Sequence, residues 1–172
     1  AARSVSVSSN TAPTWLRWLP QVQAALLPGP PVPHDELLLV RDLAGGLVRR
    51  FEPPPGLAAR LGAVLVLLYR QGDDLQLPLT VRSERLPSHR GEVSLPGGAI
   101  DPEDAAPAAA ALRERREELG VDPATITVLG SLSSFYIQPS NFQITPVVGF
   151  CAQPPVLRPN DAEVSSVLTT TL

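Results

Sequence analysis

This chain of 172 residues contains no lysine, no methionine, one cysteine and few aromatic residues. Because all fourteen basic residues are arginines and the net charge is -3, the chain offers no broad positive surface for nucleic acid or a membrane. A lysine base is excluded as well. The single cysteine, Cys151, cannot form an internal disulfide and lies in an apolar run, which predicts a buried thiol and a reducing compartment.

Long apolar runs are also missing, since no stretch reaches the roughly 18 residues of a membrane span and the N-terminus has no apolar signal core. We therefore expect a soluble, cytoplasmic protein. The apolar content of 44% and the length predict one compact domain over 1–172. Its first ten residues, 1–10, are small and polar, and we expect them to be flexible.

Apolar residues recur at helical spacing after the cap candidate Thr11, which predicts an N-terminal helical segment over 11–27. Pro20 falls inside this segment and predicts a kink or a break. Trp15 and Trp18 are predicted to pack rather than to contact a ligand. A segment rich in proline and glycine follows over 28–55.

Strands are predicted from short apolar runs bounded by turn residues. The segments concerned are 37–40 and 47–51 as short edge strands, then 63–69, 75–81, 126–132, 142–150 and 164–172. A turn at 71–74 joins two of them into a hairpin. With one helix between the second and third core strands, this order predicts an α+β domain in which the helix packs against the sheet.

That helix carries three clustered carboxylates, Glu114, Glu117 and Glu118, at positions i, i+3 and i+4. On a helix these side chains converge on one face, where each like-charged pair costs about 0.2–0.5 kcal/mol. A bound divalent cation turns that repulsion into attraction. The cluster therefore predicts a metal site.

The limits of the helix follow from its own end signals. Asp101 or Asp104 is predicted to cap the start, and Gly120 suits the left-handed position after the end. The apolar face opposite the carboxylates is predicted to consist of Ala108, Ala111, Leu112 and Leu119. One side of the helix would then pack while the other gathers oxygen ligands.

Carboxylates together with a carbonyl from a turn at Gly97 and Gly98 suit Mg²⁺ or Mn²⁺, and such a site is suited to cleave a diphosphate. Arg113 is predicted to pair with Glu117 one helical turn on. The amides of the glycine turn are expected to face phosphate oxygens. An arginine- and glutamate-rich helix alone is more often a solvated surface, but the flanking glycines and strands favour the functional interpretation.

The segment over 97–121 resembles the Nudix box, with the general pattern Gly-x5-Glu-x7-Arg-Glu-x-x-Glu-Glu-x-Gly. Arg113 to Gly120 match its second half fully, whereas Asp104 takes the first glutamate position and eight residues then precede Arg113. Arg115 replaces the usual small or aliphatic residue. The resemblance implies a Nudix hydrolase, with a mixed β-sheet sandwiched between α-helices.

A second motif lies immediately upstream, in the runs Leu-Thr-Val-Arg-Ser over 79–83 and His-Arg-Gly-Glu-Val-Ser-Leu-Pro-Gly-Gly over 89–98. With the Gly-Gly-x-x-Asp-x-x-Asp start of the box and an Asn-x-x-Glu-Val segment at 160–164, it resembles the coenzyme A pyrophosphatase subfamily. Pro87 and Leu95 stand where that subfamily usually has arginine and phenylalanine.

The subfamily resemblance implies the roles of individual residues. Its implied metal ligands are Glu114, Glu118, Glu117 and the Gly98 carbonyl, and its implied catalytic residues are Glu117, Glu114, Glu118 and Arg113. Glu117 is either a third ligand or the water-activating partner. Substrate contacts are implied for Arg82, Ser83, Arg90, Gly97 and Gly98, with Arg82 equally able to orient the glycine loop. Further candidates for the general base are Glu92 and Glu163, and His89 is more often solvated than bound to substrate.

The activity implied is Mg²⁺- or Mn²⁺-dependent hydrolysis of coenzyme A or its derivatives into 3′,5′-ADP and 4′-phosphopantetheine. One alternative is another nucleoside diphosphate derivative, such as ADP-ribose or a dinucleotide. Another is a nucleotide-binding module without catalysis, although the intact Arg-Glu-x-x-Glu-Glu argues against it. The expected partner is a small nucleotide, with neither nucleic acid nor membrane, and a homodimer is left open by the resemblance.

Overall fold

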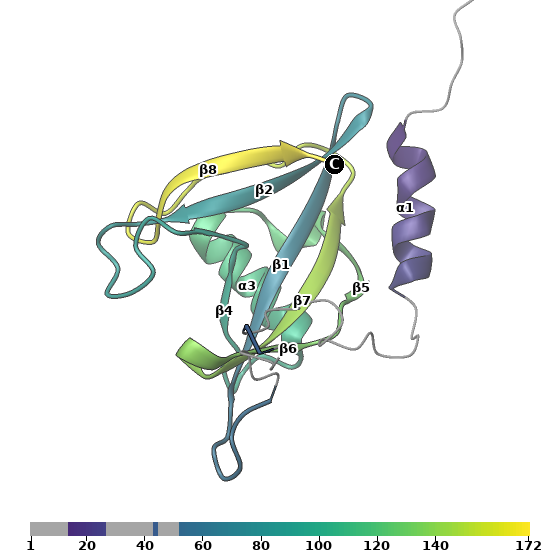
Figure 1. Cartoon of the computed structure of the whole chain (residues 1–172). Coiled ribbons are helices and arrows are strands. Elements are labelled where there is room, and N and C mark those ends of the chain that lie inside the picture. The colour runs from purple at the N-terminus through teal and green to yellow at the C-terminus, as the bar shows by residue number, and fades with distance from the viewer. Residues whose placement is uncertain (1–13, 27–42, 45–51) are drawn as a thin grey trace, which may run out of the picture.

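The structure, a computed structural model, describes residues 14–26, 43–44 and 52–172 (Figure 1). Several predictions lie outside these ranges, namely the flexible start 1–10, the Thr11 cap and the edge strands 37–40 and 47–51. Among the helices within the described ranges, none is long and apolar enough to cross a bilayer.

One mixed sheet of eight strands organises the described chain. Its strands are β1 (Arg60–Gln71), β2 (Asp74–Arg82), β3 (Val93–Ser94), β4 (Gly97–Ala99), β5 (Thr127–Ser131), β6 (Phe135–Ile137), β7 (Phe142–Cys151) and β8 (Val164–Thr171). The order is β3-β2-β1-β7-β5, with β4 on β1, β6 on β7 and β8 on β2. The pair of β1 and β7 is parallel and the other pairs are antiparallel. The two central strands are thus joined by the parallel pairing.

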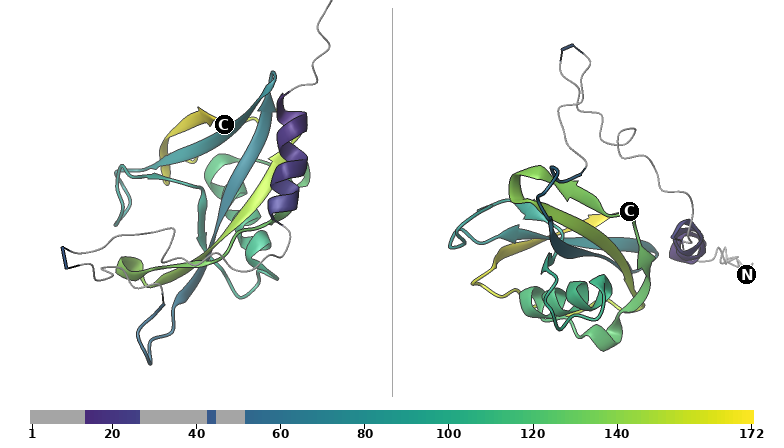
Figure 2. Two further views of the ribbon diagram at one scale, coloured as in Figure 1. Left: turned by 45° about the vertical axis from the view of Figure 1, so that its right-hand side comes forward. Right: turned by 90° about the horizontal axis from the view of Figure 1, so that it is seen from below.

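Two helices, α1 (Thr14–Ala25) and α3 (Pro107–Leu119), lie on different sides of this sheet (Figure 2). Successive residues of a strand point to opposite faces, so the apolar run of β1 serves both helices. Leu65 and Leu67 belong to the buried cluster that α3 covers, whereas Leu68 packs with Val148 and Phe150 in the cluster against α1. The predicted α+β fold, with a mixed sheet between helices, is confirmed.

The N-terminal helix α1 forms within the predicted segment and continues through Pro20 without a break. Trp15 stacks on Phe150 with ring centroids 6.0 Å apart, as its predicted packing role requires. Trp18 is 50% exposed, so a packing role does not extend to it. The reason is helical spacing, because Trp15, Leu19, Val22 and Leu26 form the stripe that packs on the sheet.

The longer predicted strands and the hairpin of β1 and β2 are confirmed, but the glycine turn is not. Gly97 and Gly98 lie in β4, which pairs with β1 opposite Val64 and Ala63. A Cβ at Gly97 would collide with the Ala63 carbonyl oxygen and the Val64 Cα atom. Glycine is therefore required there for close approach of two strands rather than for a turn.

Candidate active site

Helix α3 begins at Pro107, after an extended Ala106 that makes no side-chain cap. The predicted capping by Asp101 or Asp104 is therefore wrong. Asp104 instead accepts a hydrogen bond from the Asp101 amide at 2.9 Å, and its carboxylate contacts Arg113. Proline at the first helical position tolerates the missing cap, since its φ is already helical and it has no amide hydrogen to satisfy.

The end of α3 and its packing face follow the predictions closely. Gly120 has a φ of 66° and its amide donates to the Arg116 carbonyl, which stops the helix in the left-handed conformation. Ala110, Ala111 and Leu119 are buried, and Ala108 and Leu112 are partly buried against the same cluster. Two charged residues of the helix, Arg115 and Glu118, are buried as well.

Arg113 holds the acidic residues around the start of the site together. Its guanidinium lies 2.9 Å from Glu114, 3.0 Å from Asp104, 3.2 Å from Glu117 and 3.3 Å from Asp101. It also donates to the Ala99 carbonyl oxygen at 3.0 Å, which ties α3 to β4. The hydrogen bond from Arg113 lowers the pKa of Asp104, and the carboxylates raise the pKa of Arg113. The predicted pair with Glu117 is present, within a larger network.

The three glutamates of the cluster lie in different environments. Glu118 is 5% exposed, the Glu114 side chain is 16% exposed and the Glu117 side chain is 52% exposed. Because burial disfavours the charged form, it raises the pKa of Glu114 and raises the pKa of Glu118 to about 7. Glu118 therefore has the strongest need for a positive partner, because Glu114 already pairs with Arg113.

Two observations are compatible with a divalent cation at Glu114 and Glu118. Glu118 Oε2 is buried and has no hydrogen-bond partner, and a Cβ at Gly98 would overlap the Glu114 carboxylate. Glycine at position 98 thus leaves room for the Glu114 carboxylate against β4, and carboxylate oxygens are ligands that Mg²⁺ and Mn²⁺ prefer. As the side chains stand, no group of three histidine, cysteine or acidic residues within the described ranges is arranged to hold a metal.

The glycine amides do not all face outward as predicted. The backbone of Gly97 makes a hydrogen bond to Glu118, and this bond lowers the pKa of Glu118 against the larger effect of burial. The donor that the sequence suggested for phosphate oxygens is thus turned toward a carboxylate. Close pairing of β4 with β1 sets this direction.

Arg82, at the end of β2, lies where its charge acts on Glu118 and lowers the pKa of that carboxyl group. Its Nε atom is buried without a hydrogen-bond partner. Ser83 is buried, its amide donates to the Glu163 carbonyl oxygen at 2.8 Å and its hydroxyl donates to the Asp161 carbonyl oxygen at 3.4 Å. Arg82 is placed toward the carboxylates, whereas Ser83 ties its loop to the segment before β8.

That segment brings Glu163 to the site. Asn160 donates from its amide to the Glu118 carbonyl oxygen at 2.8 Å and from its side chain to Glu163 Oε1 at 3.2 Å. The charge of Glu163 raises the pKa of both Glu114 and Glu118. The sequence did not predict that Asn160 connects Glu118 to Glu163. The pattern that could have indicated it is the Asn-x-x-Glu spacing of Asn160 and Glu163.

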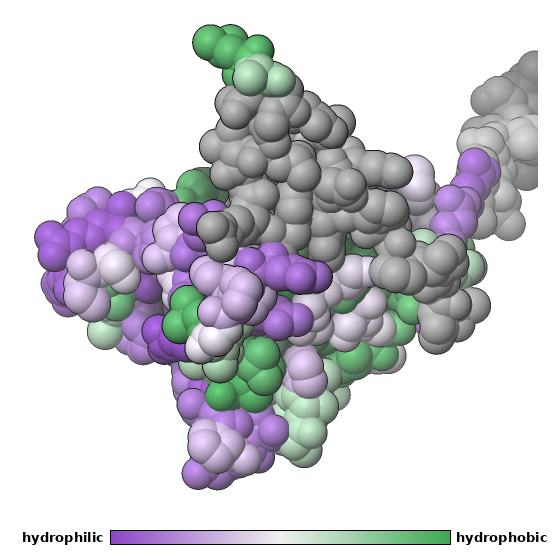
Figure 3. Space-filling view, turned by 60° about the horizontal axis from the view of Figure 1, so that its bottom comes forward, coloured by the Kyte–Doolittle hydropathy of each residue, from purple (hydrophilic) through white to green (hydrophobic). Residues whose placement is uncertain are grey.

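The loop from β2 to β3 carries the remaining predicted residues. His89 Nδ1 and Glu92 Oε2 pair at 2.9 Å and both side chains are exposed. Arg90 Nε donates to the Leu86 carbonyl oxygen at 2.6 Å. The loop belongs to the hydrophilic left side of the molecule in Figure 3. Of the two predicted bases outside α3, Glu163 is the one whose charge acts on the buried glutamates.

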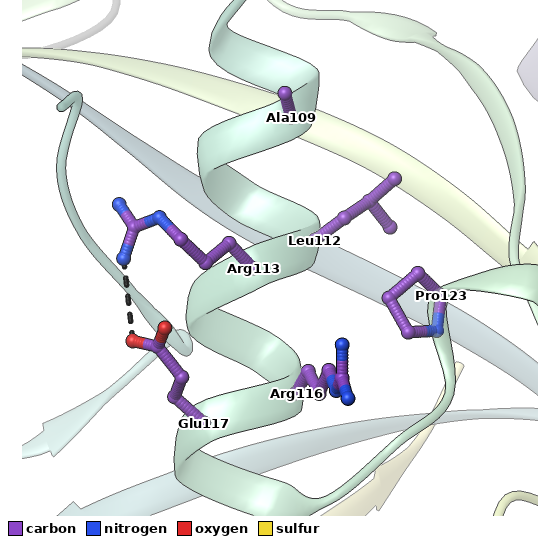
Figure 4. A pocket seen from close by; sticks show the side chains of 6 residues that line it. All are labelled: Ala109, Leu112, Arg113, Arg116, Glu117 and Pro123. Atoms are coloured by element: carbon purple, nitrogen blue, oxygen red, sulfur yellow. Dashed lines mark hydrogen bonds and ion pairs between the residues drawn. The ribbon is translucent and has the colours of Figure 1, made fainter. Parts of the chain in front are cut away.

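A pocket of about 490 Å³ runs along the exposed side of α3 (Figure 4). It is lined by Ala109, Leu112, Arg113, Arg116, Glu117 and Pro123. Glu114 and Glu118 do not line it. The pocket therefore reaches the exposed edge of the acidic network from the solvent side.

The fold and this helix define the class of protein. The NUDIX domain model matches residues 59–168, and the chain belongs to this family. The predicted membership of the Nudix hydrolases is confirmed.

Among its relatives, an uncharacterized Nudix hydrolase NudL of Escherichia coli (strain SMS-3-5) is 42% identical over 108 residues, covering 63% of this chain and 55% of the relative. The peroxisomal coenzyme A diphosphatase NUDT7 of Mus musculus is 42% identical over 105 residues, covering 61% and 44%. The chain spans about half the length of these relatives. The resemblance to the coenzyme A-cleaving branch is thereby supported.

Solved structures confirm the fold. A Nudix hydrolase from M. smegmatis, RenU, superposes with a TM-score of 0.56 at 24% sequence identity, covering 67% of this chain and 72% of that one. At this identity the likeness concerns the fold alone.

Proposed function

We propose that this chain hydrolyses the diphosphate linkage of coenzyme A or its derivatives with Mg²⁺ or Mn²⁺, releasing 3′,5′-ADP and 4′-phosphopantetheine. The main support is the buried, unpartnered oxygen of Glu118, together with the Glu114 carboxylate that lies against Gly98. The mouse relative, named as a coenzyme A diphosphatase, supports the substrate.

In this proposal Glu114 and Glu118 hold the cation, with Glu117 and the Gly98 carbonyl as further ligands. When bound, a divalent cation neutralises the diphosphate and acidifies a ligated water. Arg113 keeps Glu114 and Glu117 oriented through one hydrogen bond to each carboxylate. The oxygen of water attacks one phosphorus, the bridging phosphorus–oxygen bond breaks, and the water proton passes to a carboxylate.

We propose Glu163 as this general base, because its charge raises the pKa of both Glu114 and Glu118. Glu92 is a weaker choice, since its carboxylate is paired with His89. Replacement of Glu163 by glutamine is expected to lower kcat with a small effect on KM. An equal decrease of kcat in Glu163→Gln and Glu92→Gln would contradict the choice of Glu163 as the general base.

Substrate recognition is proposed for Arg82, Ser83, Arg90, Gly97 and Gly98. The Nε atom of Arg90 donates a hydrogen bond to the carbonyl oxygen of Leu86, the residue before Pro87. This bond holds the guanidinium near position 87. This is the position at which the coenzyme A subfamily usually has an arginine. Arg90 can therefore supply positive charge for the extra phosphate of coenzyme A. Arg90→Gln is expected to raise KM for coenzyme A and leave kcat unchanged.

The deciding experiment incubates the purified chain with Mg²⁺ or Mn²⁺ and coenzyme A, ADP-ribose or dinucleotides, with a chelator control, and identifies products by mass spectrometry. Release of 3′,5′-ADP from coenzyme A supports the proposal. Cleavage of the other compounds alone replaces it with the second substrate class. Binding without cleavage of any compound identifies a nucleotide-binding module instead.

Location and assembly belong to the same proposal. We infer a cytoplasmic location from the sequence, and fluorescence imaging of the tagged full-length protein tests it. A homodimer follows only from the family resemblance. Light scattering during size-exclusion chromatography distinguishes one chain from two.

A further inference from the structure

Arg115 is a fully buried arginine on α3, with an exposed fraction of 0%. Its Nε, Nη1 and Nη2 atoms are all buried and have no hydrogen-bond partner in the described part of the chain. It lies on the helix face that packs against the sheet, where the position usually holds a small or aliphatic residue. Neither the fold nor the proposed reaction accounts for a guanidinium at this place.

The guanidinium of Arg115 keeps its charge. Burial lowers the pKa of Arg115 to about 10, so the group is still protonated at neutral pH. The charges that act on it most are those of Glu118, Cys151 and Tyr69. Cys151 is buried as predicted, and burial raises the pKa of its thiol, which leaves Glu118 as the ionisable partner that matters.

Arg115 and Glu118 are buried groups of opposite charge, each with side-chain atoms that have no hydrogen-bond partner, and no hydrogen bond joins the two. They are three residues apart on one helix, and Glu118 Oε2 is also buried without a partner. Charges interact more strongly in a poorly polarisable interior than in water. A positive charge at Arg115 attracts the Glu118 carboxylate, and it repels any cation that this carboxylate binds.

We propose that Arg115 is a positioning residue that lowers the affinity of the site for a free divalent cation. It balances Glu118 when no cation is bound, and the cation is held firmly only when the negative charge of a diphosphate enters with it. This inference rests on the proposed metal-dependent function and adds a relation between cation binding and substrate binding. Cation and substrate bind cooperatively rather than independently.

The test measures Mg²⁺ affinity by isothermal titration calorimetry at pH 8.5, without substrate. Arg115→Met removes the charge and keeps much of the side-chain volume, and we expect Mg²⁺ to bind about tenfold more tightly. Arg115→Lys retains the charge and should restore an affinity close to that of the unmodified chain. Arg116→Met removes the same charge from the exposed side of the same helix and should change the affinity less than about twofold.

A second measurement follows the cooperativity with methylenediphosphonate, a diphosphate analogue that is not hydrolysed. In the unmodified chain the analogue should tighten Mg²⁺ binding, and the factor should be several-fold smaller in Arg115→Met. Circular dichroism checks folding of each variant. If Arg115→Met does not fold, Arg115→Leu, which restores the usual residue class, replaces it.

Equal Mg²⁺ affinity in Arg115→Met and Arg116→Met, with unchanged cooperativity, would overturn the role of Arg115. Weaker Mg²⁺ binding in Arg115→Met would overturn it too. These outcomes leave the proposed function intact if the unmodified chain binds Mg²⁺ and cleaves its substrate. If the unmodified chain neither binds Mg²⁺ nor cleaves any diphosphate, the proposed function itself is wrong.

Discussion

At the scale of single residues, Glu118 combines burial with an oxygen that has no hydrogen-bond partner. Glu118→Gln keeps the shape of the side chain and removes the charge that a cation would bind. We expect turnover of coenzyme A to fall at least about a hundredfold while the fold is retained. Steady-state kinetics and circular dichroism measure the two effects.

The control for this change is Glu103→Gln, an exposed acidic residue before α3. It removes the same charge outside the buried pair and should leave turnover unchanged. Activity of Glu118→Gln at the level of Glu103→Gln would remove Glu118 from the site.

The same residue predicts how stability depends on pH. Burial raises the pKa of Glu118 from 4.5 to about 7, so the folded chain binds this proton more tightly than the unfolded chain. Without cation, the free energy of unfolding should fall by roughly 2–3 kcal/mol as the pH rises from about 4.5 to about 7. Urea unfolding at several pH values measures this fall. If the free energy of unfolding of Glu118→Gln falls as steeply with pH as that of the unmodified chain, the fall does not arise from Glu118.

Sequence reasoning at this scale found the acidic residues but not all their partners. The pair of Arg113 and Glu117 follows from helical spacing, which the sequence displays. The contact of Arg113 with Asp104 depends on the path of the chain between β4 and α3, which no local pattern reports. The burial of Arg115 was equally invisible, because a charged residue in a charged run predicts exposure.

At the scale of elements, β4 places two adjacent glycines against different neighbours. A Cβ at Gly98 meets the end of the flexible Glu114 side chain, whereas a Cβ at Gly97 meets the backbone of β1. Gly98→Ala should therefore displace Glu114 and lower turnover about tenfold, with a stability change below about 1 kcal/mol.

Gly97→Ala is the matched change with the opposite balance. Because backbone cannot move aside as a side chain can, it should lower the free energy of unfolding by about 2 kcal/mol or more. Chemical denaturation and activity assays compare the two variants. Equal stability of both would refute this division of roles.

Helix α1 allows a second matched pair. Trp15 stacks on Phe150 and lies under the Arg70 guanidinium, while Trp18 on the same helix is 50% exposed. Trp15→Ala should lower the free energy of unfolding by roughly 2 kcal/mol, and Trp18→Ala by less than about 0.5 kcal/mol. Urea denaturation measures both. A larger loss in Trp18→Ala would show that α1 packs through its other face.

The longer strands and both helices were predictable because their apolar patterns persist over many residues. Strands β3, β4 and β6 were not, since each spans two or three residues and exists through pairing with a longer neighbour. Pairing between distant segments leaves no periodic trace in such short stretches. The prediction of a turn at Gly97 and Gly98 was wrong for this reason, because these residues pair with β1 as part of β4.

At the scale of the whole molecule, cation binding and folding are linked. A ligand that binds the folded chain alone stabilises it by about 2.7 kcal/mol at a hundredfold excess over its Kd. For a chain of this size that corresponds to a rise in Tm of about 5–10 °C. Calorimetric scans with and without Mg²⁺ measure it, and Glu118→Gln should show no comparable rise.

The parallel pairing of β1 with β7 has a consequence for biogenesis. These two strands form the centre of the sheet, yet β2 to β6 and α3 all lie between them in the chain. During synthesis the end of β1 can pair with β2 at once, whereas the edge that pairs with β7 along the whole strand has no partner until much later. Closing so long a loop is slow, and an open edge on an apolar central strand favours aggregation in the meantime. Protection of the nascent chain by a chaperone is therefore expected to matter more here than in a sheet built from neighbouring hairpins.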